Sequence, residues 1–147
     1  SYGSHFNYKE RYPEEFAKFQ PANATEVEYK NKDQLINAYD NSILYTDYFL
    51  HSLIGILKNS GADATMIYSP DHGEDLLDDN RKRFLHASPI PTYYQIHIPF
   101  LMWFSDNYIE ARPEKYEVAR YNSNAPISSN ASIFHTLLEM AEITINP

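Results

Sequence analysis

A short run of β-favouring residues at positions 64–68 ends at a Ser-Pro pair, and four chemically distinctive residues follow without a gap: Asp71, His72, Gly73 and Glu74. In α/β proteins, the loops at the carboxyl ends of strands carry the ligand-binding and reactive side chains. A strand that stops at a proline and continues as Asp-His-Gly-Glu therefore predicts an α/β fold with a functional site directly after this strand.

The chemistry of this turn points to a divalent metal. Asp71 offers a hard carboxylate oxygen and His72 a borderline imidazole nitrogen, a pair that suits Zn²⁺ or Mn²⁺ better than Ca²⁺, which prefers oxygen ligands alone. Gly73 leaves room for a close approach or a positive φ, and Glu74 can orient His72 or begin the next turn. The alternative is an ordinary surface turn, because proline, aspartate and glycine all favour turns.

Composition indicates one globular domain. The 147 residues are 43% hydrophobic and 15% aromatic, which is enough for a core, and the formal net charge is −8. Because an acidic chain repels phosphate backbones, we expect no nucleic-acid partner. The basic run at 81–83 follows four acidic residues and is interpreted as a solvated, charge-balanced segment. Contact between one of its arginines and an anionic substrate group is the alternative.

Cysteine is absent from the sequence, which excludes a thiol nucleophile and a disulfide framework. No stretch approaches the roughly 20 apolar residues of a membrane-spanning helix, and nothing resembles a signal peptide. The chain begins abruptly at Gly3-Ser4-His5, a second candidate site motif, with no element leading into it. A free-standing domain would normally have an element that leads into such a motif.

Periodicity predicts the main elements. Apolar residues recur at three- and four-residue spacing across residues 33–58, which indicates a long amphipathic helix. A nearly continuous apolar run at 96–104 predicts a second buried strand, of the kind found in parallel sheets covered on both faces. A final amphipathic helix is predicted at 129–141, capped by Ser128 or Ser129. Shorter helical turns are predicted at 13–19 and 113–121, and a flexible charged excursion at 75–83.

Histidines recur beside small or turn-forming residues at His5 and His86, and a series of sequence blocks accompanies them. The blocks are Gly3-Ser4-His5, Arg11-Tyr12-Pro13 with Phe16 and Phe19-Gln20-Pro21, residues 37–42 with Tyr45-Thr46-Asp47, residues 71–74, Leu85-His86, and residues 99–103. In this order they resemble the sulfatase-like phosphoethanolamine transferases of the alkaline phosphatase superfamily, over nearly the whole chain. An ordered series is far more specific than any single motif.

The resemblance implies a fold and a site. The fold would be a partial alkaline phosphatase or sulfatase-like α/β fold, a mostly parallel sheet flanked by helices, with residues 1–147 as the carboxyl-terminal portion of one catalytic domain and no second domain. By the same resemblance, Asp71 and His72 are zinc ligands, with Mn²⁺ as the alternative metal. His5 and His86 would be catalytic residues that line the substrate phosphate or hold a second metal, and such histidines donate to or protonate a leaving group.

The implied reaction is a two-step phosphoryl transfer through a covalent phosphothreonine, from a phosphatidylethanolamine donor to a lipid or glycan acceptor. The family's threonine nucleophile and its remaining acidic metal ligand are expected upstream of Gly3. A membrane anchor is expected there too, which would place this portion of a bacterial inner-membrane protein in the periplasm. We therefore expect the isolated chain to be inactive and to bind metal weakly, because two protein ligands fall short of the three or four typical of zinc sites.

Three other interpretations stay open from the sequence. A sulfatase, phosphodiesterase or phosphoglycerol transferase of the same superfamily would be told apart by its nucleophile, which is a cysteine-derived formylglycine in sulfatases and a threonine in phosphoryl transferases. A non-catalytic binding module on the same fold belongs to another class, and complete loss of metal binding in the whole protein would favour it. Incidental histidines in an ordinary α/β domain are hard to reconcile with the ordered blocks.

Overall fold

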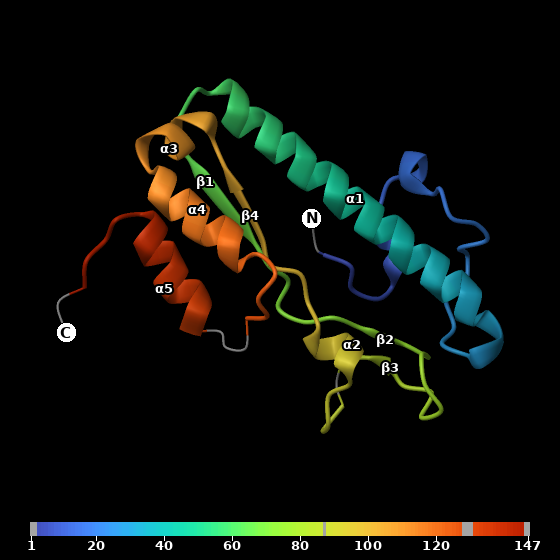
Figure 1. Cartoon of the computed structure of the whole chain (residues 1–147). Helices are drawn as coiled ribbons and strands as arrows, with labels where there is room; N and C mark the ends of the chain where they lie inside the picture. Colours follow the sequence, from blue (N-terminus) through green and yellow to red (C-terminus); the bar gives the residue numbers. More distant parts are fainter. Residues whose placement is uncertain (1–2, 87, 128–130, 146–147) are drawn as a thin grey trace. The chain divides into compact units, whose positions relative to one another are not determined.

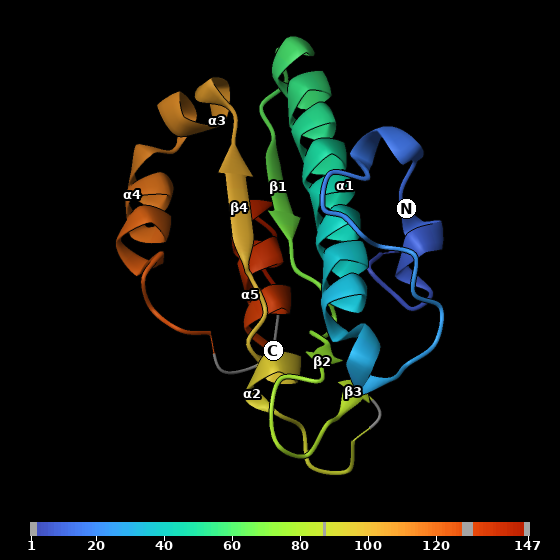
Figure 2. The same cartoon turned by 90° about the vertical axis from the view of Figure 1, so that its right-hand side faces the viewer.

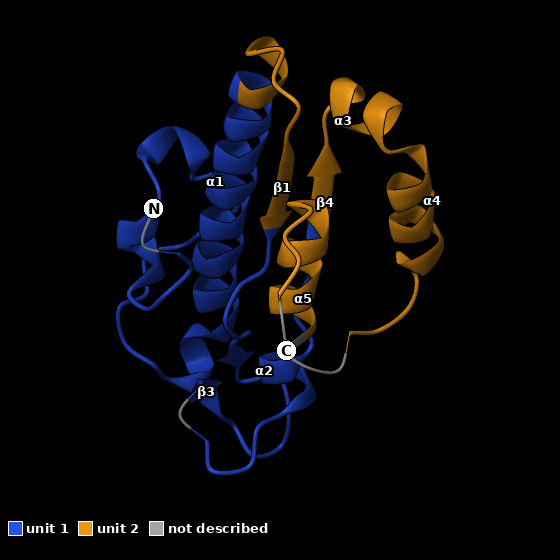
Figure 3. Ribbon diagram, turned by 90° about the vertical axis from the view of Figure 1, so that its left-hand side faces the viewer, with its two compact units in different colours: residues 1–56, 68–101 blue, residues 57–67, 102–147 orange. Residues whose placement is uncertain are grey.

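The computed structural model describes residues 3–86, 88–127 and 131–145, and the chain divides into two compact units (Figures 1 and 3). Unit 1 comprises residues 1–56 and 68–101, and unit 2 comprises residues 57–67 and 102–147. Among the described residues, no helix combines the length and the hydropathy that crossing a bilayer requires.

The long helix α1 spans Lys32–Asn59 and confirms the helix predicted at 33–58. Its buried side chains include Leu35 and Ala38, which are three residues apart and so lie on one face of the helix. At the start of the helix, Lys32 donates from Nζ to the carbonyl oxygen of Leu77 (2.9 Å), which ties α1 to a distant turn of unit 1.

A buried polar side chain on α1, Asn41, anchors the amino-terminal segment. Its Oδ1 accepts a hydrogen bond from the backbone N–H of Phe19 (2.8 Å), and its Nδ2 donates to the Phe19 carbonyl (2.9 Å) and the Tyr12 hydroxyl (3.2 Å). These bonds replace the water that the amide loses on burial. Helical periodicity alone assigns Asn41 to the polar face, and only the segment packed over it explains why it is completely buried.

The core of unit 1 forms where this segment meets α1 and a hairpin. Three short 3₁₀ turns, η1 (Tyr8–Arg11), η2 (Glu14–Phe16) and η3 (Tyr29–Asn31), interrupt the segment, and η2 confirms one helical turn within the predicted range 13–19. The core consists of the buried Tyr8, Ala22 and Ala38 with the partly buried Phe6, Tyr39, Leu76, Phe84 and Leu85.

The hairpin pairs strands β2 (Asp75–Leu76) and β3 (Phe84–Leu85) antiparallel, with Asp75 opposite Leu85 and Leu76 opposite Phe84. The backbone N–H of Leu77 also donates to the carbonyl of Arg83 (2.8 Å), which extends the ladder by one pair. The prediction of a flexible excursion over 75–83 is therefore wrong at its start. Asp75 and Leu77 are buried because the hairpin folds back onto the core.

The strand predicted at 96–104 is shorter than expected. Helix α2 occupies Tyr93–Ile96, and strand β4 occupies only Leu101–Phe104. Thr92 caps α2 by accepting a hydrogen bond from the backbone N–H of Gln95, which favours a helical turn before the apolar run. Pro99 lacks the N–H that a central strand residue donates, so pairing starts after it.

The expectation of a mostly parallel sheet is not met by the described strands. They form two two-stranded sheets, β2 with β3 and β1 (Thr65–Tyr68) with β4. Figure 2 shows the arrows of β1 and β4 pointing in opposite directions, and β2–β3 is also antiparallel. A parallel pair needs a crossover long enough to return the chain to its starting end. The connection between β1 and β4, residues 69–100, is long enough for a crossover, but its described part forms the β2–β3 hairpin and helix α2 instead.

Unit 2 contains three further helices, α3 (Asp106–Ala111), α4 (Pro113–Asn122) and α5 (Ala131–Met140). Helix α4 begins with a proline and confirms the turn predicted at 113–121, and α5 confirms the final amphipathic helix. The caps predicted at 128 and 129 lie outside the described residues.

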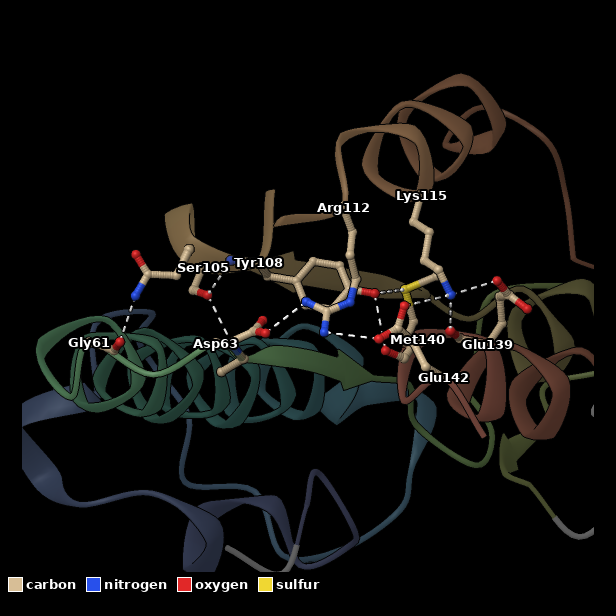
Figure 4. A network of polar contacts seen from close by, with 11 residues as sticks. Gly61, Asp63, Ser105, Tyr108, Arg112, Lys115, Glu139, Met140 and Glu142 are labelled. Atoms are coloured by element: carbon tan, nitrogen blue, oxygen red, sulfur yellow. Dashed lines mark hydrogen bonds and ion pairs between the residues drawn. The ribbon is translucent and has the colours of Figure 1, made fainter. Parts of the chain in front are cut away.

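Figure 4 shows the polar network that connects these helices. The Arg112 guanidinium donates to Asp63 (2.7 Å) and Glu142 (3.1 Å), and Lys115 pairs with Glu139 (2.7 Å). The Tyr108 hydroxyl donates to the backbone carbonyl of Met140, the last residue of α5 (3.1 Å). Asp63 and then Glu142 raise the pKa of Arg112 above its ordinary value, so the guanidinium is charged at neutral pH.

The Ser105→Ala substitution is expected to lower the free energy of unfolding by about 1–2 kcal/mol. Ser105 caps α3, and its Oγ accepts hydrogen bonds from the backbone N–H groups of Tyr108 (3.2 Å) and Ala64 (3.0 Å). Because Ser105 is buried, alanine would leave both donors without that partner. Urea unfolding would measure the change. Ser123→Ala, at an exposed position, should stay within about 0.5 kcal/mol, and equal losses in both variants would contradict the role of the cap.

Candidate metal centre

Three side chains of unit 1, His72, Glu74 and His86, are grouped so that one potential ligand atom of each lies within 4.8 Å of the other two. The hairpin register explains how residues so far apart meet. With Asp75 opposite Leu85, the next pair outward is Glu74 opposite His86. The distance of 3.0 Å between Oε1 of Glu74 and Nδ1 of His86 follows from this register.

A close backbone contact holds the loop that carries His72 and Glu74. The N–H of Gly73 donates to the carbonyl of Gln95 in α2 (2.9 Å). A Cβ added at Gly73 would lie 2.0 Å from the carbonyl oxygen of Tyr94, far inside van der Waals contact. Of the two roles predicted for this glycine, the close approach is confirmed, since its φ is not in the left-handed region.

The hydrogen bonds of three histidines define which ring nitrogen is free. Nδ1 contacts the Gly73 carbonyl in His72 (2.9 Å), the Glu74 carboxylate in His86 (3.0 Å) and the adjacent carbonyl in His5 (3.1 Å). Carbonyl and ionised carboxylate oxygens only accept, so in each bond Nδ1 carries the proton. Each neutral ring is therefore left with its lone pair on Nε2, the arrangement found in metal-binding histidines.

Of the four predicted site residues, three histidines come together. The ring centroids of His72 and His86 are 3.8 Å apart, and the ring of His5 meets that of His86 edge-on at 5.2 Å. His5 is exposed, whereas His72 and His86 are partly buried. The Gly-Ser-His motif and the Asp-His-Gly-Glu motif therefore contribute to one site, although 66 positions separate His5 from Asp71.

The fourth predicted residue, Asp71, is placed differently. Its side chain is 90% exposed, accepts a hydrogen bond from the backbone N–H of His72 (3.1 Å), and lies 3.8 Å from Nε2 of the same histidine. It does not belong to the cluster of three found among the described residues. Residues 72 and 74 point to the same side because side chains alternate along an extended segment. That spacing is the signal that could have placed Glu74 in the cluster, a position that was not predicted from the motif.

Glu74 is a carboxylate in a largely buried position. Its side chain is 4% exposed, and its second oxygen, Oε2, makes no hydrogen bond of standard geometry among the described residues. Burial raises the pKa of Glu74, while the hydrogen bond and charge of His86 and the nearby His72 and His5 act in the opposite direction. Burial, and then the neighbouring charge of Glu74, raise the pKa of the Tyr8 hydroxyl. A side-chain hydrogen bond to Glu74 also contributes to the raised pKa of Tyr8, so the Tyr8 hydroxyl and a bound cation are both candidate partners of this carboxylate.

The three side chains of the basic run at 81–83 make contacts within the chain. Nε of Arg81 donates to Asp79 (2.6 Å), Nη1 of Arg83 donates to the carbonyl of Ile90 (2.5 Å), and the ammonium of Lys82 lies 5.1 Å from a tyrosine ring centroid. These contacts agree with the interpretation of the run as a charge-balanced surface segment.

The Glu74→Gln substitution is expected to stabilise the metal-free chain at neutral pH. The pKa of Glu74 is raised in the native state, so ionisation of this carboxyl destabilises the fold. Its contribution to the free energy of unfolding is fully present below the ordinary glutamate pKa and is lost as pH rises through the native pKa. Glutamine carries no charge and escapes this loss. Thermal unfolding of both chains between about pH 4 and pH 8 would show a difference that grows with pH.

Exposed Glu15→Gln is the matched control and should show no such pH-dependent gain. A Glu74→Gln chain that melts below the unmodified chain at every pH would contradict the electrostatic description.

The profile of the sulfatase family matches residues 1–143. The chain belongs to the sulfatase family. Within it, the Kdo(2)-lipid A phosphoethanolamine 7''-transferase of Escherichia coli K12 is 38% identical over 110 residues, which cover 74% of this sulfatase-family chain and 19% of that protein. The resemblance to phosphoethanolamine transferases drawn from the ordered blocks is thereby confirmed.

Solved structures agree on the fold of this sulfatase-family chain. The integral membrane protein lipooligosaccharide phosphoethanolamine transferase A (EptA) from Neisseria meningitidis is 33% identical with a TM-score of 0.85, covering 94% of this chain and 26% of that one. The carboxyl-terminal periplasmic domain of EptC from Escherichia coli, in complex with zinc, is 33% identical with a TM-score of 0.65, covering 76% and 32%. The predicted partial sulfatase-like fold is confirmed.

The chain spans only part of its relatives. It covers 19%, 22% and 25% of the length of three curated phosphoethanolamine transferases from Escherichia coli, Salmonella typhimurium and Helicobacter pylori. These relatives are phosphoethanolamine transferases, and in this chain a cluster of two histidines and a glutamate is consistent with metal binding.

Proposed function

We propose that this sulfatase-family chain is the carboxyl-terminal portion of one catalytic domain of a phosphoethanolamine transferase and supplies part of its zinc site. The observation that carries the proposal is the convergence of His72, Glu74 and His86, with one ligand atom of each within 4.8 Å of the others. The names of the relatives support the reaction, and the partial coverage of those relatives supports a portion of a domain.

The residues present fit zinc. Two imidazole nitrogens and one carboxylate oxygen form a ligand set used by catalytic zinc sites, which bind three protein ligands and keep a position open. The carboxylate of Glu74 and the imidazoles of His72 and His86 are the donors that such an ion would use. Zinc bound there would neutralise phosphoryl oxygens and lower the pKa of a bound hydroxyl. Mn²⁺ is the alternative, and imidazole ligands favour zinc over it.

The chain's own side chains divide the remaining work. Glu74 holds the ring of His86 in place through the hydrogen bond between its Oε1 and Nδ1 of that ring. His5, exposed and edge-on to His86, has its Nε2 available to contact a substrate phosphoryl oxygen or to protonate a leaving group. Asp71 is exposed beside His72 and remains a proposed zinc ligand because of the family resemblance. In that role it would bind the ion together with ligands that do not belong to the cluster of three.

The proposed substrates are a phospholipid donor of phosphoethanolamine and a lipid or glycan acceptor. The relatives support this choice, since their names specify Kdo(2)-lipid A and lipooligosaccharide. The same relatives support a place in the periplasm for this portion, in a protein anchored to the bacterial inner membrane. The isolated chain is expected to bind zinc through its three clustered residues and to lack transferase activity, because the sequence offers no threonine in the nucleophile context of the family.

The test compares zinc content and phosphoethanolamine transfer in the protein encoded by the whole reading frame around this sequence, unmodified and with His72→Ala. Vesicles of phosphatidylethanolamine and a lipid A acceptor serve as substrates. We expect stoichiometric zinc and turnover, both lost in His72→Ala and both kept in the control His51→Ala, an exposed histidine of α1. A protein that holds no zinc and transfers nothing would overturn the proposal and favour a binding module on the same fold.

A further inference from the structure

A second carboxylate next to the metal centre, Asp75, has a different environment from Glu74. Its residue is 2% exposed, and both of its oxygens are hydrogen-bonded: Oδ1 accepts from the Thr92 hydroxyl and Oδ2 from the Gln95 amide, each at 2.5 Å. Thr92 and Gln95 are themselves buried. Both oxygens of Asp75 are therefore engaged by residues outside the metal cluster, and the cluster does not account for the burial of this side chain.

The partners of Asp75 connect it to the loop of the metal centre. Gln95, whose side chain donates to Asp75, also accepts the N–H of Gly73 through its backbone carbonyl (2.9 Å). Thr92 accepts the backbone N–H of Gln95 and so fixes the start of α2. Gln95 of helix α2 is therefore hydrogen-bonded to the residues on both sides of Glu74, Gly73 and Asp75.

Asp75 also lies where the segment that carries Glu74 pairs with the strand that precedes His86. It follows Glu74 directly and pairs across the hairpin with Leu85, which precedes His86. Leu85 has a φ of 67°, a conformation that costs free energy in a branched residue and so needs support from its surroundings. Movement of Asp75 relative to α2 would displace both Glu74 and the strand that presents His86.

We infer that Asp75 is the positioning residue of the metal centre, and that its hydrogen bonds to Thr92 and Gln95 lock α2 against the hairpin so that Glu74 and His86 keep their ligand geometry. This inference rests on the proposed metal site. Hydrogen bonds to an ionised acceptor are the strong ones, and outer partners that orient metal ligands typically change metal affinity 10–100-fold when removed.

The experiment exchanges donor and acceptor. Gln95→Glu places two carboxylates in contact and Asp75→Ala removes the acceptor, so each is expected to weaken zinc binding by about 10–100-fold. The double variant Asp75→Asn with Gln95→Glu reverses the bond, because the amide introduced at position 75 would donate to the carboxylate introduced at position 95 while its oxygen still accepts from Thr92. This double variant has the same net charge as the unmodified chain and is expected to recover zinc affinity to within about threefold of it.

Zinc affinity is measured by competition with a chromophoric chelator, and the visible absorption of bound Co²⁺ reports the ligand geometry. Gln20→Glu makes the same chemical change at an exposed position and should alter neither readout. Far-UV circular dichroism and thermal midpoints confirm that each variant is folded at the temperature of the assay.

Single variants that melt lower but bind zinc and Co²⁺ as the unmodified chain does would overturn the inference and leave Asp75 a purely structural residue. Failure of the double variant to recover affinity would also overturn it. An unmodified chain that binds no zinc would instead overturn the proposed metal centre, so the two failures are distinguishable.

Discussion

A Gly73→Ala chain is expected to lose zinc binding and to be less stable than the unmodified chain by about 3 kcal/mol or more. The added Cβ would lie 2.0 Å from the carbonyl oxygen of Tyr94. A side chain could rotate away from such a contact, but a backbone carbonyl moves only if α2 moves. The hydrogen bond from Gly73 to Gln95 would then be lost, and the loop that carries His72 and Glu74 would shift away from His86.

Gly55→Ala is the matched control for this substitution. Gly55 lies inside α1, and a Cβ there would meet no heavy atom within 4 Å. Alanine in a helix interior is expected to stabilise the chain by about 0.5–1 kcal/mol. Urea unfolding and zinc competition on both variants would therefore give opposite signs for stability and a loss of zinc in Gly73→Ala alone. Normal zinc affinity in Gly73→Ala would contradict the close approach.

A His86→Ala chain is expected to bind zinc more than about 100-fold more weakly than the unmodified chain, because loss of a ligand should exceed the 10–100-fold effect of losing an outer partner. Asp71→Asn is expected to change the affinity of the isolated chain by less than about tenfold, since the Asp71 side chain is 90% exposed and outside the cluster of three. Glu74→Gln should resemble His86→Ala, because an amide is a much poorer zinc ligand than a carboxylate.

Zinc competition on these three variants and on His72→Ala separates the two ligand sets. The ligand set implied by the resemblance predicts a large loss of zinc affinity in Asp71→Asn. The ligand set from the geometry predicts a large loss of zinc affinity in His86→Ala. If Asp71→Asn weakens binding as strongly as His72→Ala while His86→Ala does not, the cluster of three is not the zinc site of this chain. His97→Ala, at an exposed position, is the control for loss of an imidazole.

Local patterns were enough to predict the elements that depend on near neighbours in the sequence. The helix at Lys32–Asn59 and the strand at Thr65–Tyr68 appeared where periodicity and β-favouring residues placed them. The strand expected at 96–104 was too long, because the apolar run alone does not reveal the Thr92 cap that starts a helical turn within the region. The cap is a hydrogen bond between residues three apart, which hydrophobicity does not report.

Ordered motifs and residue types are local properties of a chain, so they were sufficient to predict the family and to name candidate site residues. Which of those residues meet depends on the folded chain. Glu74 faces His86 because two strands pair in one register, and a shift of one residue would turn those side chains to opposite faces. Asn41 is buried because a distant segment packs over it. Strand register and segment packing are set by the free energy of non-local contacts, which no stretch of sequence contains on its own.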